Sequence, residues 1–253
     1  MNKNLRLKLI LDTIRSDSVI DVNQIANQCN VTTKTIRLDL QELEKAGLLN
    51  RIHGGAIKPY HESNKASPAT RTQHLSQKRA IAKKAFSYIK ENDVILLDSG
   101  STTLELAKLL GGFNVVVLTN DLYIVNELAF RDKVTLFVAG GYTQRVGDNI
   151  TLAGDDAIEF IKKYHASKSF ISASAVDIDE GTSIYFYGVG QTKRAFINYA
   201  EKIYCLIDSS KFGKFGFTKV ADIAELQNII TDKDIPAETA RRIEEKGVNL
   251  IYA

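Results

Sequence analysis

A regular alternation of apolar runs and amphipathic segments between residues 94 and 245 constrains the fold most. The apolar runs are three to five residues long and occupy 94–97, 115–118, 134–138, 169–172, 203–207 and 229–231. Segments with helical periodicity lie between or after them, at 102–110, 122–130, 155–163, 191–199 and 237–245. Strands that are apolar throughout and separated by helices indicate a mainly parallel sheet covered by helices on both faces. We therefore predict an α/β domain over residues 74–253.

Residues 31–56 indicate a second, smaller unit. Thr32 is a suitable N-cap for a helix, and Gly47 suits the left-handed position that ends one. The apolar face of this helix is formed by Ile36, Leu40 and Leu43, and a polar face by Lys34, Arg37 and Gln41. Cations neutralise phosphates, and arginine and glutamine form paired hydrogen bonds with base edges, so the polar face is suited to reading DNA. Taken alone, the pattern also fits a solvated amphipathic helix.

The residues before this helix favour the DNA-binding interpretation. Apolar spacing predicts a helix over residues 5–15 and another over 22–29, for which Asp21 is the expected N-cap. Asn30 and Val31 form a tight turn before the polar-faced helix. Two short helices joined by a tight turn make a helix-turn-helix.

The distribution of charge and a predicted hairpin also favour a DNA-binding unit. Residues 48–52 and 56–58 are expected to be extended, with glycines between them that permit a tight turn, and they predict a wing. Residues 1–58 hold nine basic and six acidic residues, whereas residues 59–253 hold 24 of each. This asymmetry fits a nucleic-acid-binding module joined to a neutral domain. The candidate DNA contacts are Thr32, Thr33, Lys34, Thr35, Arg37, Gln41, Arg51 and His53.

The residues at 35–47, Thr-Ile-Arg-Leu-Asp-Leu-Gln-Glu-Leu-Glu-Lys-Ala-Gly, are followed at 51–56 by Arg-Ile-His-Gly-Gly-Ala. Together they resemble the N-terminal signature of the DeoR family of bacterial transcriptional regulators. Leu38 departs from it, since the family usually has a second arginine after Arg37. The resemblance covers residues 5–58 and implies a winged helix-turn-helix that binds double-stranded operator DNA. Such proteins usually read paired half-sites, so we expect a homo-oligomer, either a dimer or a tetramer.

Residues 59–73 contain prolines and small polar residues with little apolar periodicity, and we interpret them as a linker. Beyond them, polar residues follow several predicted strands, where parallel sheets bind their ligands. Asp98-Ser-Gly-Ser-Thr-Thr103 follows the first strand and opens a helix, an arrangement that favours an anion such as phosphate. Ordinary helix capping and turn formation by the same residues are the alternative interpretation.

Other predicted strand ends extend this candidate site. Lys193 is expected near the start of a helix, where a cation is unusual for the helix dipole and fits an anionic ligand. A solvated lysine is the alternative for Lys193 and for Lys211. The candidate ligand contacts are Asp98, Gly100, Ser101, Thr102, Thr103, Thr119, Asn120, Gly140, Gly141, Asp177, Lys193 and Lys211.

The pattern Asp98-x-Gly-Ser-Thr, with Thr119-Asn120, Gly140-Gly141 and Asp208-Ser-Ser-Lys-Phe, resembles the sensor domain of the same family. The resemblance implies a fold similar to ribose-5-phosphate isomerase and an effector that is a phosphorylated sugar or a related metabolite. It also implies a regulator, most often a repressor, of a sugar-metabolism operon. A glutamate that the family often has shortly before Lys193 is absent from Tyr185-Phe-Tyr-Gly-Val-Gly-Gln-Thr192.

Two other function classes stay open at this point. A sugar-phosphate isomerase with an added DNA-binding domain is the main alternative, since Asp98, Asp177 and Lys193 offer acid and base groups beside a phosphate. A pocket on this fold does not imply turnover, however, so we expect no enzyme. An NAD-binding regulator is disfavoured because Gly188-x-Gly190 lacks the third glycine and the preceding strand of a dinucleotide fingerprint.

The sequence contains no motif for a cofactor or a metal, and we expect neither. No apolar run approaches the ~20 residues of a membrane span. Cys29 and Cys205 lie at apolar positions and are expected to be reduced core residues, which indicates a cytoplasmic protein.

Overall fold

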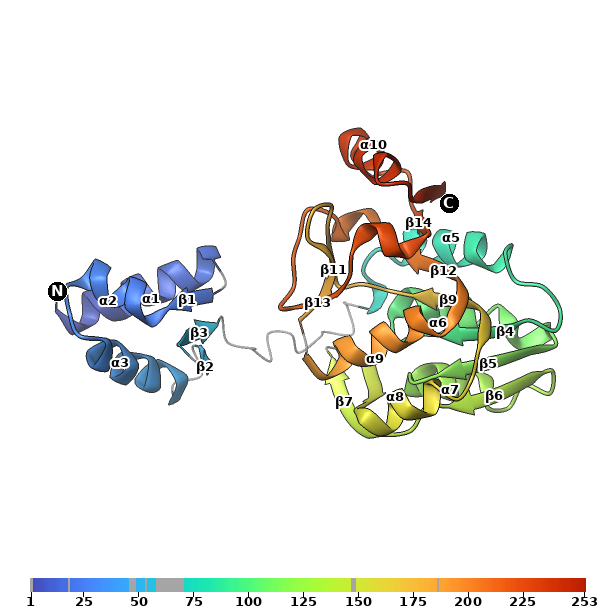
Figure 1. Cartoon of the computed structure of the whole chain (residues 1–253), viewed down its shortest axis with the longest axis horizontal. Helices are drawn as coiled ribbons and strands as arrows, with labels where there is room; N and C mark the ends of the chain where they lie inside the picture. The colour runs from blue at the N-terminus through green and yellow to red at the C-terminus, as the bar shows by residue number, and fades with distance from the viewer. Residues whose placement is uncertain are drawn as a thin grey trace. The chain divides into compact units, whose positions relative to one another are not determined.

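The computed structural model describes residues 2–17, 19–45, 49–52, 54–57, 71–146, 149–185 and 187–253. Its contacts divide the chain into Met1–Ser67, here called unit 1, and Pro68–Ala253, called unit 2. Each unit has its own apolar core, and the helices and strands of both are drawn in Figure 1. Among the described residues, none of the helices has the length and apolar character of a membrane span.

In the part of unit 1 that the structure describes, three helices pack with a small antiparallel sheet. The helices are α1 (Lys3–Asp17), α2 (Val22–Cys29) and α3 (Thr33–Lys45), and the strands, in the order β1-β3-β2, are β1 (Val19–Asp21), β2 (Asn50–Ile52) and β3 (Gly55–Ile57). Asp21 caps α2 by accepting from the N–H groups of Asn23 and Gln24, as predicted. At Gly55 the chain passes so close to β1 that a Cβ atom would lie 2.1 Å from the Ile20 carbonyl oxygen.

The core of unit 1 fixes which face of α3 is buried. Ile36, Leu40 and Leu43 are buried, which confirms the predicted apolar face. A buried ion pair that was not predicted also joins α1 to α3. Arg6 donates to Asp39 through Nε at 2.7 Å and Nη2 at 3.1 Å, a planar two-bond contact that holds orientation as well as charge. The opposite face of α3 is therefore fixed outward.

Unit 2 is built on a seven-stranded sheet in the order β15-β14-β12-β9-β4-β5-β6, in which every neighbouring pair is parallel. The strands are β4 (Val94–Leu97), β5 (Val115–Thr119), β6 (Val134–Val138), β9 (Ala166–Ile171), β12 (Ala200–Leu206), β14 (Asn228–Thr231) and β15 (Asn249–Tyr252). The predicted α/β class with a mainly parallel sheet is confirmed. Because all seven strands point the same way, their carboxyl ends lie along one edge.

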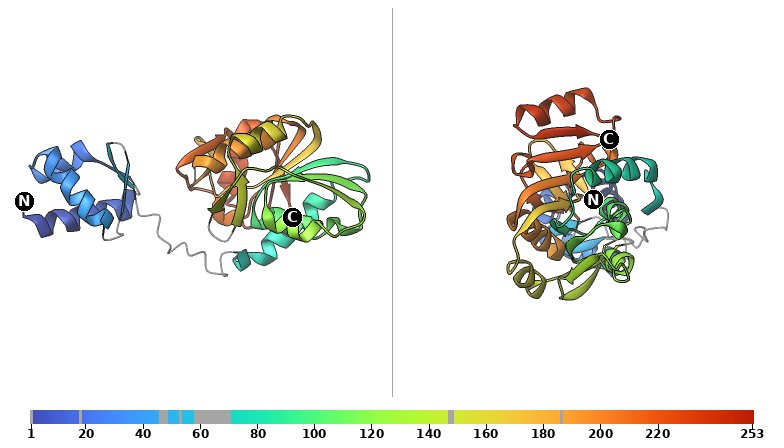
Figure 2. Two further views of the ribbon diagram at one scale, coloured as in Figure 1. Left: turned by 90° about the horizontal axis from the view of Figure 1, so that it is seen from below. Right: turned by 90° about the vertical axis from the view of Figure 1, so that its right-hand side faces the viewer.

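Helices cover both faces of this sheet (Figures 1 and 2). One core cluster joins the sheet to α5 (Leu75–Phe86), α6 (Ser101–Ala107) and α7 (Leu122–Leu128). The other joins it to α8 (Asp155–Ile161), α9 (Tyr187–Asn198) and α10 (Ala237–Glu245). Buried strands with few polar residues between two helical layers account for the apolar runs in the sequence.

The structure differs from the sequence-based expectation in several elements. It adds β15, a hairpin of β7 (Tyr142–Val146) and β8 (Asn149–Ala153), and a small sheet of β10 (Ala175–Asp177), β11 (Gly181–Ile184) and β13 (Thr218–Ala221). Residues 71 and 72, inside the predicted linker, are helical. Helix α9 begins at Tyr187 and not at residue 191. The expectation that Lys193 lies near a helix start is therefore wrong, and the dipole argument for its ligand does not apply.

Candidate functional site

The outer face of α3 presents the predicted DNA-reading residues. Lys34, Arg37 and Gln41 are exposed, and Leu38 is exposed beside them. The predicted N-cap is also present, because the Thr32 hydroxyl accepts from the Thr35 N–H at 3.2 Å. Two further candidates, Thr33 and Thr35, are partly buried in this first turn. The face therefore offers two cations, an amide and one exposed aliphatic side chain.

A cleft of about 440 Å³ separates α3 from the wing and brings Arg37 and Arg51 together. Its lining residues are Val22, Arg37, Leu40, Arg51, Ile52, Gly54 and Gly55. Arg51 is held by Glu44, which accepts from its backbone N–H at 3.0 Å and from its Nε at 2.8 Å. The backbone bond and the guanidinium both lower the pKa of Glu44. Arg51 is thus a partly neutralised cation in the cleft, and His53 lies outside the described residues.

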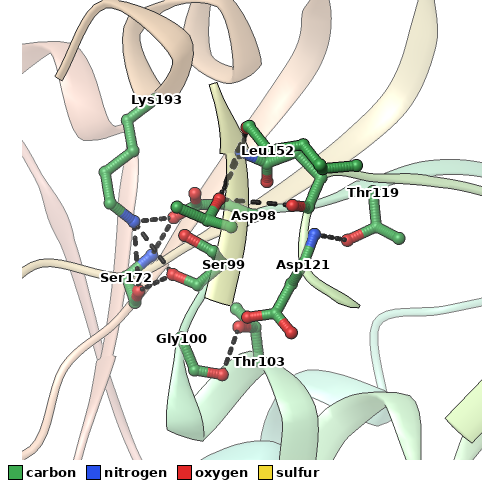
Figure 3. A network of polar contacts seen from close by, with 11 residues as sticks. Asp98, Ser99, Gly100, Thr103, Thr119, Asp121, Leu152, Ser172 and Lys193 are labelled. Atoms are coloured by element: carbon green, nitrogen blue, oxygen red, sulfur yellow. Dashed lines mark hydrogen bonds and ion pairs between the residues drawn. The ribbon is translucent and has the colours of Figure 1, made fainter. Parts of the chain in front are cut away.

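In unit 2, Asp98 lies at the carboxyl end of β4 and is completely buried. Its Oδ2 accepts from the Ser172 N–H at 3.1 Å and from the ammonium of Lys193, with which it forms an ion pair (Figure 3). Lys193 also donates to the Ser99 carbonyl at 3.0 Å and to the Ser172 hydroxyl at 3.3 Å. Lys193 therefore neutralises Asp98 and links α9 to the ends of β4 and β9.

The end of β5 forms the neighbouring part of this edge. Asn120 donates through Nδ2 to the Thr151 hydroxyl and the Leu152 carbonyl, both at 2.9 Å, which ties it to β8. The Thr119 hydroxyl accepts from the Asp121 N–H at 3.2 Å (Figure 3). Asp121 caps α7 through Oδ1. Burial raises the pKa of Asp121, and its two bonds from backbone N–H groups oppose that rise.

Three acceptor oxygens at this edge lack a partner. Asp98 Oδ1, Asn120 Oδ1 and Asp121 Oδ2 are buried and have no hydrogen-bond partner among the described residues. Buried polar atoms are nearly always paired, so a cluster of three unpaired acceptors requires an explanation. Carboxylate and amide oxygens accept only, so the groups that complete them are donors, such as hydroxyls.

The loop after β4 packs against the end of β9. A Cβ atom on Gly100 would lie 2.3 Å from the Ser172 hydroxyl, so a larger residue there would force the Ser172 side chain to move. Thr103 donates to the Gly100 carbonyl at 2.9 Å within the first turn of α6. Ser101 and Thr102 open the same helix, and Thr102 is buried.

The glycines after β6 differ from each other. Around Gly140 a Cβ atom would meet nothing within 4 Å among the described residues, so this position borders open space. Gly141 has a φ of +146° and approaches the Ala153 carbonyl, where a Cβ atom would lie at 2.3 Å. Its role is to start the β7–β8 hairpin that covers Asn120.

Two predicted contacts follow strands other than β4, β5 and β6. Asp177 ends β10, and its Oδ1 accepts from the N–H groups of Asp179 and Glu180 at 2.9 and 3.0 Å, which closes the turn to β11. This turn belongs to the small sheet and not to the seven-stranded sheet, and we leave Asp177 out of the candidate site. Lys211 follows β12 in a short 3-10 helix, and its charge acts on Lys78.

Two cations at this edge were missed by the sequence analysis. Lys78 of α5 is only 4% exposed, and Arg71 stacks on Tyr123 with its Cζ 3.5 Å from the ring centroid. Lys78 falls on the apolar face of α5 with Ile81 and Ala85, a position where a lysine is unexpected. That spacing was the available signal. For Arg71, which lies in the predicted linker, the sequence offered none.

Comparison with known protein families shows which family this chain belongs to. Residues 6–61 match the protein family described as "DeoR-like helix-turn-helix domain", and residues 73–233 match the family described as "DeoR C terminal sensor domain". The chain belongs to the DeoR family. Both predicted parts of the resemblance are thereby confirmed, and this DeoR-family protein combines a DNA-binding helix-turn-helix with a sensor domain.

Similar curated proteins match over nearly their whole length. They include the L-fucose operon activator of Haemophilus influenzae, 30% identical over 97% of this chain and 98% of that protein. The transcriptional repressor AccR of Agrobacterium fabrum is 31% identical over 88% and 87%. The HTH-type transcriptional repressor GlcR of Bacillus subtilis is 29% identical over 99% and 96%.

Similarity to solved structures is partial. Ribose 5-phosphate isomerase A of Methanocaldococcus jannaschii is 19% identical over 53% of each chain, with a TM-score of 0.39. A likeness at this level says nothing about activity.

Proposed function

We propose that this protein represses a sugar-metabolism operon, and that a phosphorylated sugar bound at the carboxyl edge of the unit 2 sheet sets its affinity for operator DNA. The observation that carries the effector site is the cluster of unpaired acceptors on Asp98, Asn120 and Asp121. The observation that supports DNA binding is the exposed face of α3 beside the wing cleft. Since the target is chromosomal DNA, we place the protein in the cytoplasm.

The acceptor cluster matches the chemistry of a sugar. Neighbouring hydroxyls on a sugar ring donate in several directions at close spacing, and three buried acceptors on adjacent strand ends receive them. Each buried acceptor left without a donor costs about 1–3 kcal/mol. A ligand without hydroxyl donors would leave that cost unrelieved, so the cluster selects for polyols.

The names of the relatives support control of sugar metabolism but leave the effector open. One relative is named for an L-fucose operon, and two of the three reported above are named repressors. We therefore propose repression as the mode of action. We also propose that the protein works as a homo-oligomer, because a single helix-turn-helix reads only one half-site.

We infer that the sensor domain binds its ligand without converting it. An isomerase needs a carboxylate free to move a proton between neighbouring carbons. Here the Asp98 carboxylate is committed to an ion pair with Lys193, and the Asp121 carboxylate caps α7. The stretch from Tyr185 to Thr192 contains no carboxylate. A sugar phosphate incubated with the full chain should remain unchanged in its NMR spectrum.

Operator binding is expected to weaken steeply as salt concentration rises. Lys34 and Arg37 face outward from α3, and each phosphate that such cations neutralise contributes a slope of about −0.9 to log K against log salt. A titration by fluorescence anisotropy at several salt concentrations measures this slope. A flat plot would contradict an electrostatic DNA interface, whatever the affinity at one salt concentration.

Phosphorylated sugars should stabilise unit 2 more than the corresponding free sugars. The probes are glucose 6-phosphate, fructose 6-phosphate and ribose 5-phosphate, each beside its unphosphorylated form. A ligand at 100 times its dissociation constant adds about 2.7 kcal/mol to the free energy of unfolding, which thermal unfolding detects. If a sugar and its phosphate stabilise the protein equally, the phosphate group does not contribute to binding. If no probe stabilises the protein, the result contradicts a sugar-phosphate effector of this class.

A further inference from the structure

Arg71 is the first described residue after the wing, and it contacts the ligand edge of unit 2. Residues 58–70 separate it from β3. Its guanidinium stacks on Tyr123, with 3.5 Å between Cζ and the ring centroid, a favourable cation–π contact. Tyr123 lies in the first turn of α7, and its N–H donates to Asp121 at 2.7 Å. Arg71 is thus held beside the residues that carry the unpaired acceptors.

Arg71 also carries an unpaired donor. Its Nη2 is buried and has no hydrogen-bond partner among the described residues. The Arg71 charge acts on the carboxylate of Asp121, yet Asp121 Oδ2 is itself unpaired, so the two groups do not satisfy each other. A ligand that carries both an anionic oxygen and a hydroxyl can complete both at once, since the oxygen accepts from Arg71 and the hydroxyl donates to Asp121.

Lys78 supplies a second cation to the same place. It is 4% exposed, and the charges that act on it are those of Asp208, Lys211, Glu105 and Arg71. Burial lowers the pKa of Lys78, the charges of Asp208 and Glu105 oppose that change, and repulsion by Lys211 and Arg71 adds to it. A bound anion would relieve the repulsion between these cations.

We propose that Arg71, together with Lys78, binds the anionic group of the effector and thereby ties the segment that leads to the DNA-binding unit to the occupied site. This inference rests on the proposed function and names the residues that sense the phosphate. Arginine is suited to the role because its planar fork binds phosphate through two parallel hydrogen bonds. An effector changes operator affinity only by binding one conformational state better than another, and a contact at Arg71 reports occupancy directly to the chain that joins the two units.

The test compares Arg71→Gln with Arg241→Gln in the full chain. Arg241 is an exposed arginine of α10 that pairs with Glu238 and Glu245, so its replacement controls for the loss of one positive charge. Calorimetry uses inorganic phosphate and the three sugar phosphates named above. Loss of a charge-assisted bond weakens binding by about tenfold or more, so Arg71→Gln should lose at least about tenfold, while Arg241→Gln binds as wild type. Free sugars should bind both variants equally.

Hydrogen exchange provides the readout for coupling. In the wild-type protein, the sugar phosphate that binds most tightly should slow amide exchange in residues 71–78. Saturating concentrations should leave that exchange unchanged in Arg71→Gln. Retained protection in this variant would overturn the coupling, because the segment would then respond without the arginine.

The remaining outcomes separate this inference from the proposed function. Unchanged phosphate affinity in Arg71→Gln overturns the inference alone, whereas failure of every probe to bind the wild-type protein overturns the proposed function and the inference with it. If Arg71→Gln fails to fold, Arg71→Lys tests whether the guanidinium binds the phosphate. It keeps the charge but loses the fork, and it should bind more weakly than wild type. Affinity equal to wild type would overturn the role of the guanidinium.

Discussion

Replacing Lys193 with methionine is expected to lower the free energy of unfolding of unit 2 by about 3–5 kcal/mol. Lys193 and Asp98 form an ion pair whose side chains are 6% and 0% exposed. Methionine keeps most of the length of the side chain but removes its charge, and the Asp98 carboxylate would then be buried without a counter-charge. Breaking one half of a buried pair is costly because the desolvated charge that remains has no compensation.

Tyrosine signals can measure this change in unit 2. Nine of the ten tyrosines lie in residues 68–253, so near-UV circular dichroism during urea unfolding reports on that unit. Lys202→Met is the matched control, since Lys202 is exposed on β12 and its loss should change little. The double variant Asp98→Asn with Lys193→Met should recover part of the stability. A single variant as stable as wild type would show that the pair contributes nothing.

Replacing Arg37 with alanine is expected to weaken specific operator binding by about 1–3 kcal/mol, which is roughly 5- to 150-fold. Arg37 is exposed on α3 and lines the wing cleft, so its removal takes away a contact to DNA without disturbing the core. Affinity is measured by anisotropy on a DNA fragment that the wild-type protein selects from genomic DNA.

The control for Arg37 is an arginine in unit 2. Arg131→Ala removes an equal charge from the segment that follows α7, where Arg131 pairs with Glu127. It should leave operator affinity unchanged. Far-UV circular dichroism should be the same for both variants and the wild type. If Arg37→Ala binds the selected fragment as tightly as wild type, α3 does not read the operator through this residue.

Sequence patterns predicted the strands and helices with a regular apolar pattern, and missed those in which apolar and polar residues are mixed. The runs at 94–97 and 115–118 became β4 and β5 because burial on both faces demands apolar residues. In the β7–β8 hairpin, β7 is largely exposed and carries polar residues such as Gln144 and Arg145, so no apolar run marks it. The start of α9 was missed because Gly188 and Gly190, which disfavour helices, lie in its first turn.

The candidate site was predicted in position but not in the roles of its residues. Asp98 and Asn120 follow apolar strands, and parallel topology brings their loops together. A sequence does not show which side chains pair with each other. Lys193 was therefore predicted to bind a ligand, whereas in the structure it neutralises Asp98. Lys78 and Arg71 were missed because a lysine on a helix and an arginine in a linker are both usually solvated.

The separate core of unit 1 has a consequence for protein synthesis. That core contains only residues of unit 1, and α1 to α3 are joined by short-range contacts that form early. A ribosome adding about 5–20 residues per second needs roughly 10–40 seconds to synthesise residues 68–253. We therefore expect the DNA-reading helix to fold before the sensor domain is finished, so that sensitivity to the metabolite is acquired only after unit 2 has been made.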